Sequence, residues 1–171
     1  MKRLSILRHA KSSWDDANLE DLNRPLNNRG RKSARRIGRE FKRRGVHFDL
    51  VLASPAARVR ETIDGLREEL EINAEIRFEA ALYLAAGAAL MRTVRQIPEA
   101  FRAPLLVGHN PGLQQFILEL TGADRHGWRD RVIEKLPTAA FVQIELAALH
   151  WREVTDGNGY ISELMFPKEL A

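Results

Sequence analysis

The sequence contains no cysteine, which excludes disulfides, thiol nucleophiles and zinc–thiolate sites and is compatible with a reducing cytoplasm. Long apolar runs are also missing, because no stretch approaches the roughly 20 residues that a membrane-spanning helix needs. The basic start, MKRLSILRHAK, holds only a short apolar stretch, whereas a secretory signal requires a longer one and a small-residue cleavage site. We therefore expect a cytoplasmic protein with no membrane partner.

Several catalytic signatures are absent as well. There is no GxSxG elbow of serine hydrolases, no GxxxxGK[ST] or GxGxxG loop for nucleotides, and no HExxH or similar spacing for a catalytic metal. Asp15 and Asp16 are adjacent acids in a polar stretch, and a solvated turn explains them better than a metal site does. We therefore expect neither a metal nor a cofactor.

What remains is the composition of an ordinary globular protein. The 171 residues are 44% hydrophobic and 29% charged, which is enough to bury a sizeable core without cross-links. No internal repeat, low-complexity tract or linker divides the sequence. We therefore expect residues 1–171 to form a single domain.

The excess positive charge lies in one segment. Between Arg24 and Arg44 there are ten Lys or Arg residues and one acid, while the rest of the chain holds 17 basic and 22 acidic residues. Apolar residues at helical spacing predict an amphipathic helix over 29–45. A solvated surface helix is the favoured interpretation, and a docking face for an acidic protein or nucleic acid is the alternative. Because no aromatic residues interleave with the basic ones, we expect no nucleic-acid partner.

Short apolar runs alternate with longer helical patterns along the chain. Strands are predicted at 3–8, 48–53, 104–109 and 138–146, with weaker candidates at 75–78 and 160–166. Helices are predicted at 29–45, 56–71, 86–97 and 111–121. This alternation indicates an α/β three-layer sandwich, with a mostly parallel central sheet and helices on both faces. The segments 12–28 and 122–137 show no clear period, and we expect irregular excursions there.

Polar residues follow the three best strands, as Arg8-His9-Ala10-Lys11-Ser12, Ser54-Pro55-Ala56-Ala57-Arg58 and Gly108-His109-Asn110-Pro111-Gly112. In open α/β sheets, ligands bind outside the carboxyl ends of the strands, where these segments would meet. Two of them also have the pattern of a helix start, with Ser54 or Asn110 as N-cap and a proline at the first helical position. Helix N-termini attract anions.

Two arginines and two histidines would therefore converge on one edge of the sheet. Together, Arg8, Arg58, His9 and His109 suit a doubly charged tetrahedral group, because a guanidinium contacts phosphate oxygens with two N–H groups at once. Any one of them alone would more often be a packing or ion-pairing residue, but their occurrence at equivalent strand ends favours function. The other histidines have no such partners and are interpreted as packing residues: His47, His126 and His150.

Arg8-His9-Ala10 after a strand resembles the Arg-His-Gly signature of the histidine phosphatase superfamily, which has the phosphoglycerate-mutase-like fold. Within it, the chain is similar to the small phosphohistidine phosphatases of the SixA type. The stretches that carry the resemblance keep the family's order: LSILRHAKSSWDD (4–16), RPLNNRGRKSA (24–34), DLVLASPAARVRET (49–62) and LLVGHNPGL (105–113).

The resemblance implies that His9 is the nucleophile and becomes phosphohistidine, which water then hydrolyses. It also implies that Arg8, Arg58 and His109 bind the phosphoryl oxygens and neutralise their charge, a task that other enzymes assign to magnesium. The remaining candidates for substrate contact are Ser12 and Asn110.

Two departures from the superfamily pattern bear on the substrate. Ala10 replaces the usual glycine, and the region where larger members carry an acidic proton donor reads FEAALYLAAG, with Glu79 placed too early. The candidates for a general acid are therefore Asp15, Asp16, Glu79 or none. Without an acid, esters with poor leaving groups react slowly, whereas the leaving imidazole of phosphohistidine can itself be protonated.

The leading hypothesis is a metal-independent phosphatase that acts on phosphohistidine in a signalling or phosphotransfer protein. A phosphomonoesterase that acts on a small phosphorylated molecule is the alternative. A third hypothesis, from another class, is a non-catalytic phosphate-binding module whose basic helix 29–45 holds a partner. The sequence leaves the oligomeric state open.

Overall fold

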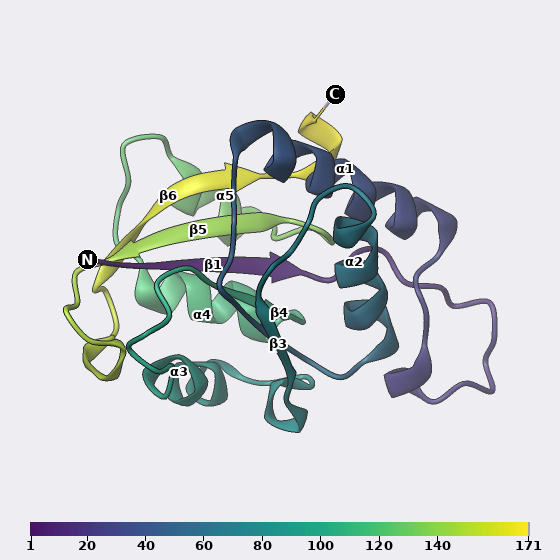
Figure 1. Ribbon diagram of the computed structural model, residues 1–171, viewed down its shortest axis with the longest axis horizontal. Coiled ribbons are helices and arrows are strands. Elements are labelled where there is room, and N and C mark those ends of the chain that lie inside the picture. Colours follow the sequence, from purple (N-terminus) through teal and green to yellow (C-terminus); the bar gives the residue numbers. More distant parts are fainter. Residues whose placement is uncertain (171) are drawn as a thin grey trace.

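The computed structural model describes residues 1–170, and its central element is a six-stranded sheet (Figure 1). The order across the sheet is β3-β2-β4-β1-β5-β6. The strands are β1 (Lys2–Arg8), β2 (Leu50–Ala53), β3 (Glu75–Phe78), β4 (Pro104–Gly108), β5 (Phe141–Leu146) and β6 (Gly159–Met165). All six lie where the sequence predicts strands, and the α/β prediction is confirmed.

The pairing of the strands brings the polar segments together. β1 pairs in parallel with β4, so that Arg8 lies opposite Gly108, and β4 pairs in parallel with β2, so that Val107 lies opposite Ala53. These three strands therefore end side by side at one edge of the sheet. β3 extends the parallel part, while β5 and β6 run antiparallel. The prediction of a mostly parallel sheet is confirmed.

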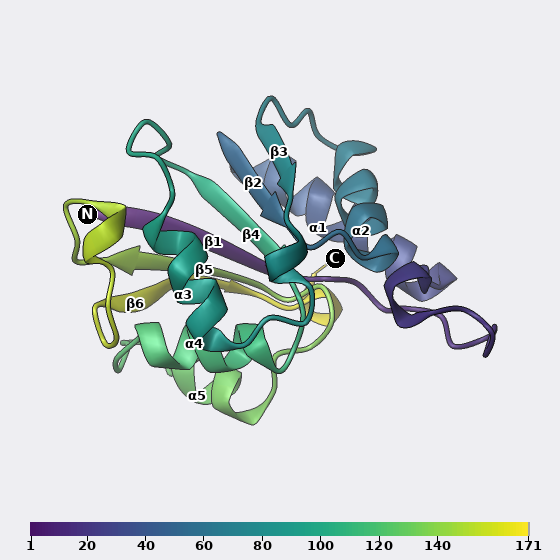
Figure 2. The ribbon, with the colours of Figure 1, turned by 90° about the horizontal axis from the view of Figure 1, so that it is seen from below.

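Helices cover both faces of the sheet (Figure 2). One face carries α1 (Asn28–Arg44) and α2 (Ala57–Arg67). The other carries α3 (Gly87–Arg95), α4 (Gly112–Leu120) and α5 (Trp128–Glu134). Short 3-10 turns connect the elements: η1 (Asp21–Asn23), η2 (Ala80–Leu82), η3 (Trp151–Glu153) and η4 (Pro167–Glu169). None of the helices in residues 1–170 is both long and apolar enough to cross a bilayer.

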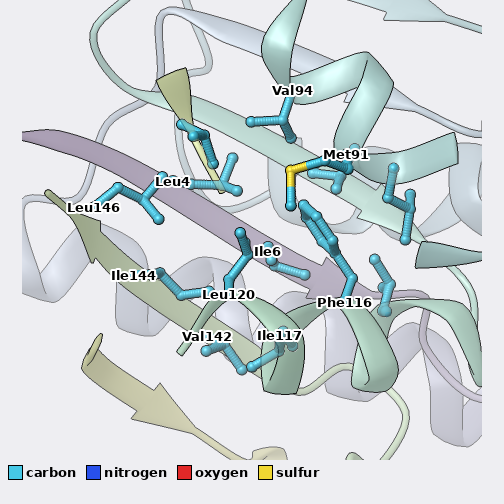
Figure 3. Packing of buried hydrophobic residues seen from close by; sticks show 14 of the residues in the cluster. Leu4, Ile6, Met91, Val94, Phe116, Ile117, Leu120, Val142, Ile144 and Leu146 are labelled. Atoms are coloured by element: carbon cyan, nitrogen blue, oxygen red, sulfur yellow. The ribbon is translucent and has the colours of Figure 1, made fainter. Parts of the chain in front are cut away.

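The alternation of side chains along β1 divides the core into two clusters. Leu4 and Ile6 point to the face of α3 and α4, where Phe116 and Ile117 pack against them (Figure 3). Leu7 joins the cluster on the opposite face, under α1 and α2. Because both faces of the sheet are buried, β4 is apolar throughout and the buried middle of β1, from Leu4 to Leu7, is apolar except for Ser5.

The segment 122–137 is not wholly irregular, and the prediction is wrong there. It contains α5, whose start is fixed by Asp124, because this carboxylate accepts hydrogen bonds from the backbone N–H groups of His126, Trp128 and Arg129. The helix is only seven residues long, too short for a clear period. By contrast, the segment between β1 and α1 is irregular as predicted, apart from η1.

The basic helix α1 has an apolar face that is buried as predicted. Several of its arginines pair with acids of α1 itself or of the region around the end of α2. Arg35 lies 3.3 Å from Glu68, and Arg39 lies 2.9 Å from Glu69. Arg43 and Arg44 both bind Glu40. These pairs neutralise much of the local charge, which favours the surface-helix interpretation over a docking face.

The start of α1 presses against the loop that follows β1. A Cβ atom at Gly30 would lie 2.0 Å from the carbonyl oxygen of Lys11, which is backbone and cannot rotate away. The same oxygen accepts a hydrogen bond from the N–H of Asn27 at 3.0 Å. A side chain at position 30 would therefore push α1 away from the loop that carries His9.

We predict that Gly30→Ala destabilises the protein by about 1–3 kcal/mol, the usual cost of overpacking a buried site. Urea unfolding followed by circular dichroism measures the change. Gly122→Ala is the matched control, because a Cβ atom there meets nothing within 4 Å. Equal unfolding midpoints for the two variants would show that the contact at Lys11 can relax.

Candidate active site

The loop that carries His9 is fixed by hydrogen bonds from two neighbouring elements. The backbone N–H of His9 donates to Gly108 of β4 at 3.1 Å. The N–H of Ala10 donates to Thr62 Oγ1 at 3.0 Å, and the same hydroxyl donates to the carbonyl oxygen of Arg58 at 2.6 Å. Thr62 and Arg58 both belong to α2, so one helix positions the loop and also supplies an arginine.

His9 is held in a single tautomer. Its Nδ1 lies 2.7 Å from the carbonyl oxygen of Ala10, and because a carbonyl only accepts, Nδ1 carries the hydrogen. The other ring nitrogen, Nε2, therefore keeps its lone pair. Burial lowers the pKa of His9 to about 3; the bond to Ala10 opposes this, and the charges of His109, Arg58 and Arg8 add smaller lowering effects. At neutral pH the ring is an uncharged nucleophile.

His109 lies beside it, with the two ring centres 5.2 Å apart. Arg58 Nη2 lies 3.3 Å from His109 Nδ1, and because a guanidinium only donates, Nδ1 is the acceptor. The hydrogen of the neutral ring is then on Nε2, which donates to Ser54 Oγ at 2.7 Å. Burial, followed by the charge of Arg58, lowers the pKa of His109 to about 4. Both ring nitrogens thus have protein partners.

Arg58 is 2% exposed and is held by a residue that the sequence analysis missed. Its Nη1 donates to the backbone oxygen of Asp21 at 2.8 Å, and its Nη2 donates to Asp21 Oδ2 at 3.0 Å. The carboxylate also accepts from Arg24 at 3.0 Å and from the Tyr83 hydroxyl. The hydrogen bond from Tyr83, followed by those from the two arginines, holds the pKa of Asp21 well below its usual range.

Arg8 is anchored on the opposite side of the site, where its Nη1 donates to the carbonyl oxygen of Leu136 at 2.9 Å. The two further candidates for substrate contact, Ser12 and Asn110, lie at the same edge of the sheet, but their side chains bind protein groups. The Ser12 hydroxyl accepts from Arg24. Asn110 donates to the Leu136 oxygen at 3.2 Å and accepts from the N–H of Gln114 at 3.2 Å.

Three guanidinium groups in this region have an Nε atom that is buried and has no hydrogen-bond partner among residues 1–170: Arg8, Arg24 and Arg58. A buried donor without an acceptor is unfavourable. An anion with several oxygens would satisfy such donors, and guanidinium groups suit phosphate in particular. The arrangement therefore favours a phosphate-like ligand.

The expected helix starts need a correction. α2 begins at Ala57 and α4 at Gly112, so neither Pro55 nor Pro111 is the first helical residue. The N-caps are Ala56 and Pro111, and the predictions of Ser54 and Asn110 as N-caps are wrong. The Ser54 hydroxyl instead accepts from the N–H of Ala56 at 3.2 Å and binds His109. The prediction that Arg58 lies in the first turn of a helix is confirmed.

The carboxylates of the predicted general acids form no hydrogen bond to this cluster within residues 1–170, although the backbone N–H of Glu79 donates to Ala53 at 2.8 Å. Asp15 and Asp16 are exposed on the loop between β1 and α1, and Glu79 follows β3, where its charge acts on the exposed Arg77. None of the hydrogen bonds in residues 1–170 joins these carboxylates to His9 or Arg58. Nor do the described residues include a group of three or more His, Asp or Glu arranged to hold a metal ion.

The comparisons with known proteins agree with this geometry. The family model described as Histidine phosphatase superfamily (branch 1) matches residues 4–102. An uncharacterized protein of Mycobacterium tuberculosis is 30% identical over 154 residues, which cover 88% of this chain and 93% of that protein. An uncharacterized chloroplastic protein of Arabidopsis thaliana is 30% identical over 131 residues, which cover 71% of this chain and 60% of the plant protein.

Solved structures share the fold at lower identity. SixA from Agrobacterium tumefaciens superposes with a TM-score of 0.80 at 23% identity, covering 97% of this chain and 98% of that one. The protein histidine phosphatase SixA in complex with tungstate gives 0.77 at 21% identity, covering 98% of both chains. A mycobacterial glucosyl-3-phosphoglycerate phosphatase gives 0.63 at 14% identity, covering 94% of this chain and 97% of that one.

The low pKa values of the two histidines predict an acid-sensitive fold. Below the ordinary histidine pKa of about 6.5 the unfolded chain binds two protons that the folded chain excludes, so stability falls as pH drops from 6.5 toward 4. Each histidine contributes at most about 1.4 kcal/mol per pH unit. His9→Gln should therefore make the fall between pH 6 and 5 shallower, as urea unfolding at each pH measures. A variant with the full wild-type slope would contradict the exclusion of the proton from His9.

Proposed function

On the premise that the chain belongs to the histidine phosphatase superfamily, we propose that it is a phosphatase that acts through a phosphoenzyme on His9. The observation that carries the proposal is the state of His9 itself. Its ring is neutral, its tautomer is fixed by the Ala10 oxygen, and its free Nε2 lies in a buried site with Arg8, Arg58 and His109. A poised nucleophile among phosphate-binding cations suits phosphoryl transfer.

The reaction would take two steps. In the first, the Nε2 lone pair forms a bond to phosphorus while the bond to the leaving group breaks, and the leaving atom keeps that electron pair and takes a proton. In the second, a water oxygen bonds to phosphorus, the Nε2–phosphorus bond breaks, and its electron pair returns to His9. The water proton goes to solvent and inorganic phosphate leaves. The Nδ1 hydrogen bond to Ala10 would stabilise the charged phosphohistidine throughout.

The cations of the site would replace a metal in this scheme. As the phosphoryl group transfers, negative charge spreads over its three oxygens, and fixed guanidinium groups stabilise that charge without reorganising. Arg58 is buried and Arg8 is half-buried, so their charges are less screened than in bulk water. His109 would contribute by orienting Arg58 and by donating to an oxygen after a change of partner.

We infer the substrate class from the protonation states of the titratable groups of the site. His9 and His109 have pKa values of about 3 and about 4, and Asp21 is held ionised by its partners. None of these three would carry a proton for the leaving group at neutral pH. The Tyr83 hydroxyl keeps its proton, because burial raises its pKa, and donates a hydrogen bond to Asp21. A phosphoramidate depends less on a general acid of the enzyme than an ester does, because its leaving imidazole accepts a proton directly from water. This supports phosphohistidine on a signalling or phosphotransfer protein as the substrate.

A small phosphorylated molecule is the second candidate. It is favoured by the likeness in fold to a glucosyl-3-phosphoglycerate phosphatase, which shows that this fold accommodates such an activity in another protein. The third hypothesis, a non-catalytic module that uses the basic helix α1, receives less support because Glu68, Glu69 and Glu40 neutralise much of its charge.

The phosphoenzyme can be trapped directly. We predict that rapid quenching in EDTA with a radiolabelled phosphohistidine donor gives an acid-labile, base-stable phosphate on the wild type and none on His9→Ala. Turnover should fall by at least about a thousandfold in His9→Ala. Arg58→Ala should keep the nucleophile but lose about 10²–10³ in rate, the usual effect of removing one charge-stabilising donor. Unchanged turnover in a folded His9→Ala would exclude covalent catalysis at this residue.

The leaving group provides a separate test of the substrate class. We predict that kcat/KM falls from a phosphohistidine peptide to p-nitrophenyl phosphate and then to an alkyl phosphate such as glycerol phosphate. The last step should exceed about 10²-fold, the lower end of what a general acid contributes. Measuring all three donors with the same preparation removes differences in active enzyme. Equal or faster turnover of the alkyl ester would indicate a general acid and the small-molecule alternative.

A further inference from the structure

The carboxylate of Asp21 is already hydrogen-bonded to Arg58, the arginine that the proposed reaction needs as a phosphate ligand. The segment between β1 and α1 runs out beside α2 (Figure 2), and its turn η1 carries Asp21 onto Arg58. One terminal nitrogen of Arg58 is bound by the backbone oxygen of Asp21, and the other is shared by the carboxylate and His109. The carboxylate and the backbone oxygen of Asp21 therefore each use an N–H group of Arg58 that phosphoryl oxygens would require.

Asp21 is placed on the solvent side of this arginine. The side chain of Arg58 is 2% exposed, whereas that of Asp21 is 43% exposed. Arg24 and the hydroxyl of Tyr83 hold the same carboxylate from other directions. Two guanidinium groups and a hydroxyl around a pair of anionic oxygens make a set of donors suited to phosphate as well.

We propose that Asp21 is a built-in competitor of the phosphoryl group, which exchanges with it on Arg58 and helps to expel inorganic phosphate after each turnover. The inference rests on the proposed function, because it takes Arg58 as a phosphate ligand. A dianion that enters the site meets an ionised carboxylate on the same donors, so the two repel each other. When phosphate leaves, the return of Asp21 satisfies the exposed guanidinium and disfavours rebinding. Asp21 thus weakens the binding of product.

The opposite role would be a staple that holds Arg58 in position for phosphate. The two roles predict opposite changes. If Asp21 competes, its neutralisation strengthens the binding of phosphate; if it is a staple, its neutralisation weakens that binding. Asp21→Asn distinguishes them, because the amide keeps the size of the side chain and one acceptor oxygen but removes the charge.

Calorimetric titration with inorganic phosphate is the central experiment. We expect Asp21→Asn to bind phosphate at least about tenfold more tightly than the wild type, which corresponds to about 1.4 kcal/mol. Product inhibition by phosphate should rise by the same factor. Asp15→Asn is the matched control, since it removes the same charge from the same exposed loop without contacting an arginine, and its affinity should equal that of the wild type. Equal or weaker binding by Asp21→Asn would overturn the proposal.

Arg58→Ala separates this inference from the proposed function. If Arg58→Ala binds phosphate as well as the wild type, Arg58 is not a phosphate ligand and the proposed site is wrong. If Arg58→Ala loses binding while Asp21→Asn gains none, only the competition is wrong. Should Asp21→Asn fail to fold, Asp21→Ala provides a second variant, because it removes the carboxylate and leaves every donor around it in place. We expect it to tighten phosphate binding as well, and unchanged or weaker binding would overturn the proposal.

The loop also carries its own reporter of the exchange. The guanidinium of Arg24 lies 3.7 Å from the ring centre of Trp14, and Trp14 is 73% exposed. Because Arg24 binds Asp21, displacement of the carboxylate should alter the stacking on Trp14 and change its fluorescence. The change should saturate with phosphate at the calorimetric Kd and disappear in Trp14→Phe. Phosphate binding that leaves Trp14 fluorescence unaltered would contradict an exchange.

Discussion

The burial of the Arg58 guanidinium is the constraint on which the rest of the site depends. A buried charge without partners is costly, and Arg58 also lies in the first turn of α2, where the helix dipole disfavours a cation. Three groups compensate for this: the backbone oxygen of Asp21, its carboxylate and the lone pair of His109. The last of these fixes the tautomer of His109, which in turn makes Ser54 an acceptor. One buried cation thus determines the hydrogen-bonding state of its neighbours.

The hydrogen bonds that hold the fold together also position the residues of the site. The hydroxyl of Thr62 donates to the carbonyl oxygen of Arg58 and accepts from the N–H of Ala10. One turn of α2 thus ties the backbone of Arg58 to the loop that carries His9. The parallel register of β1 and β4 adds the bond from His9 to Gly108. A change that shifts α2 or the sheet register would therefore move the nucleophile and the charge around it together.

How far the sequence predicts this molecule depends on the range of the interactions involved. Local runs and periods encode the strands and the four longer helices. The four main site residues are identifiable because each ends a strand, directly follows one or lies in the first turn of the next helix: Arg8, His9, Arg58 and His109. Asp21 is not, because its partners Arg58 and Tyr83 lie 37 and 62 residues further along the chain and the segment around it has no period.

Two details of the sequence-based prediction are wrong: the N-caps of α2 and α4, and the absence of α5. Ser54 is a residue type that often caps helices, but α2 begins only at Ala57. The Ser54 hydroxyl binds the local N–H of Ala56 and also His109, which follows a strand and lies 55 residues away. A tertiary partner here is added to a local one. The helix α5 was missed for the converse reason: its determinant, the carboxylate of Asp124, is local, but the helix is too short to show a period.

The pKa of His9 connects the resting site to the reaction proposed for it. A ring with a pKa of about 3 is always neutral at physiological pH, but so weak a base is also a poor nucleophile. Part of that depression comes from the charges of Arg58 and Arg8, and a phosphoryl dianion on these arginines would offset it. The approach of substrate would then raise the basicity of Nε2 at the moment when it must attack. Burial, the largest cause of the low pKa, keeps the ring unprotonated until then.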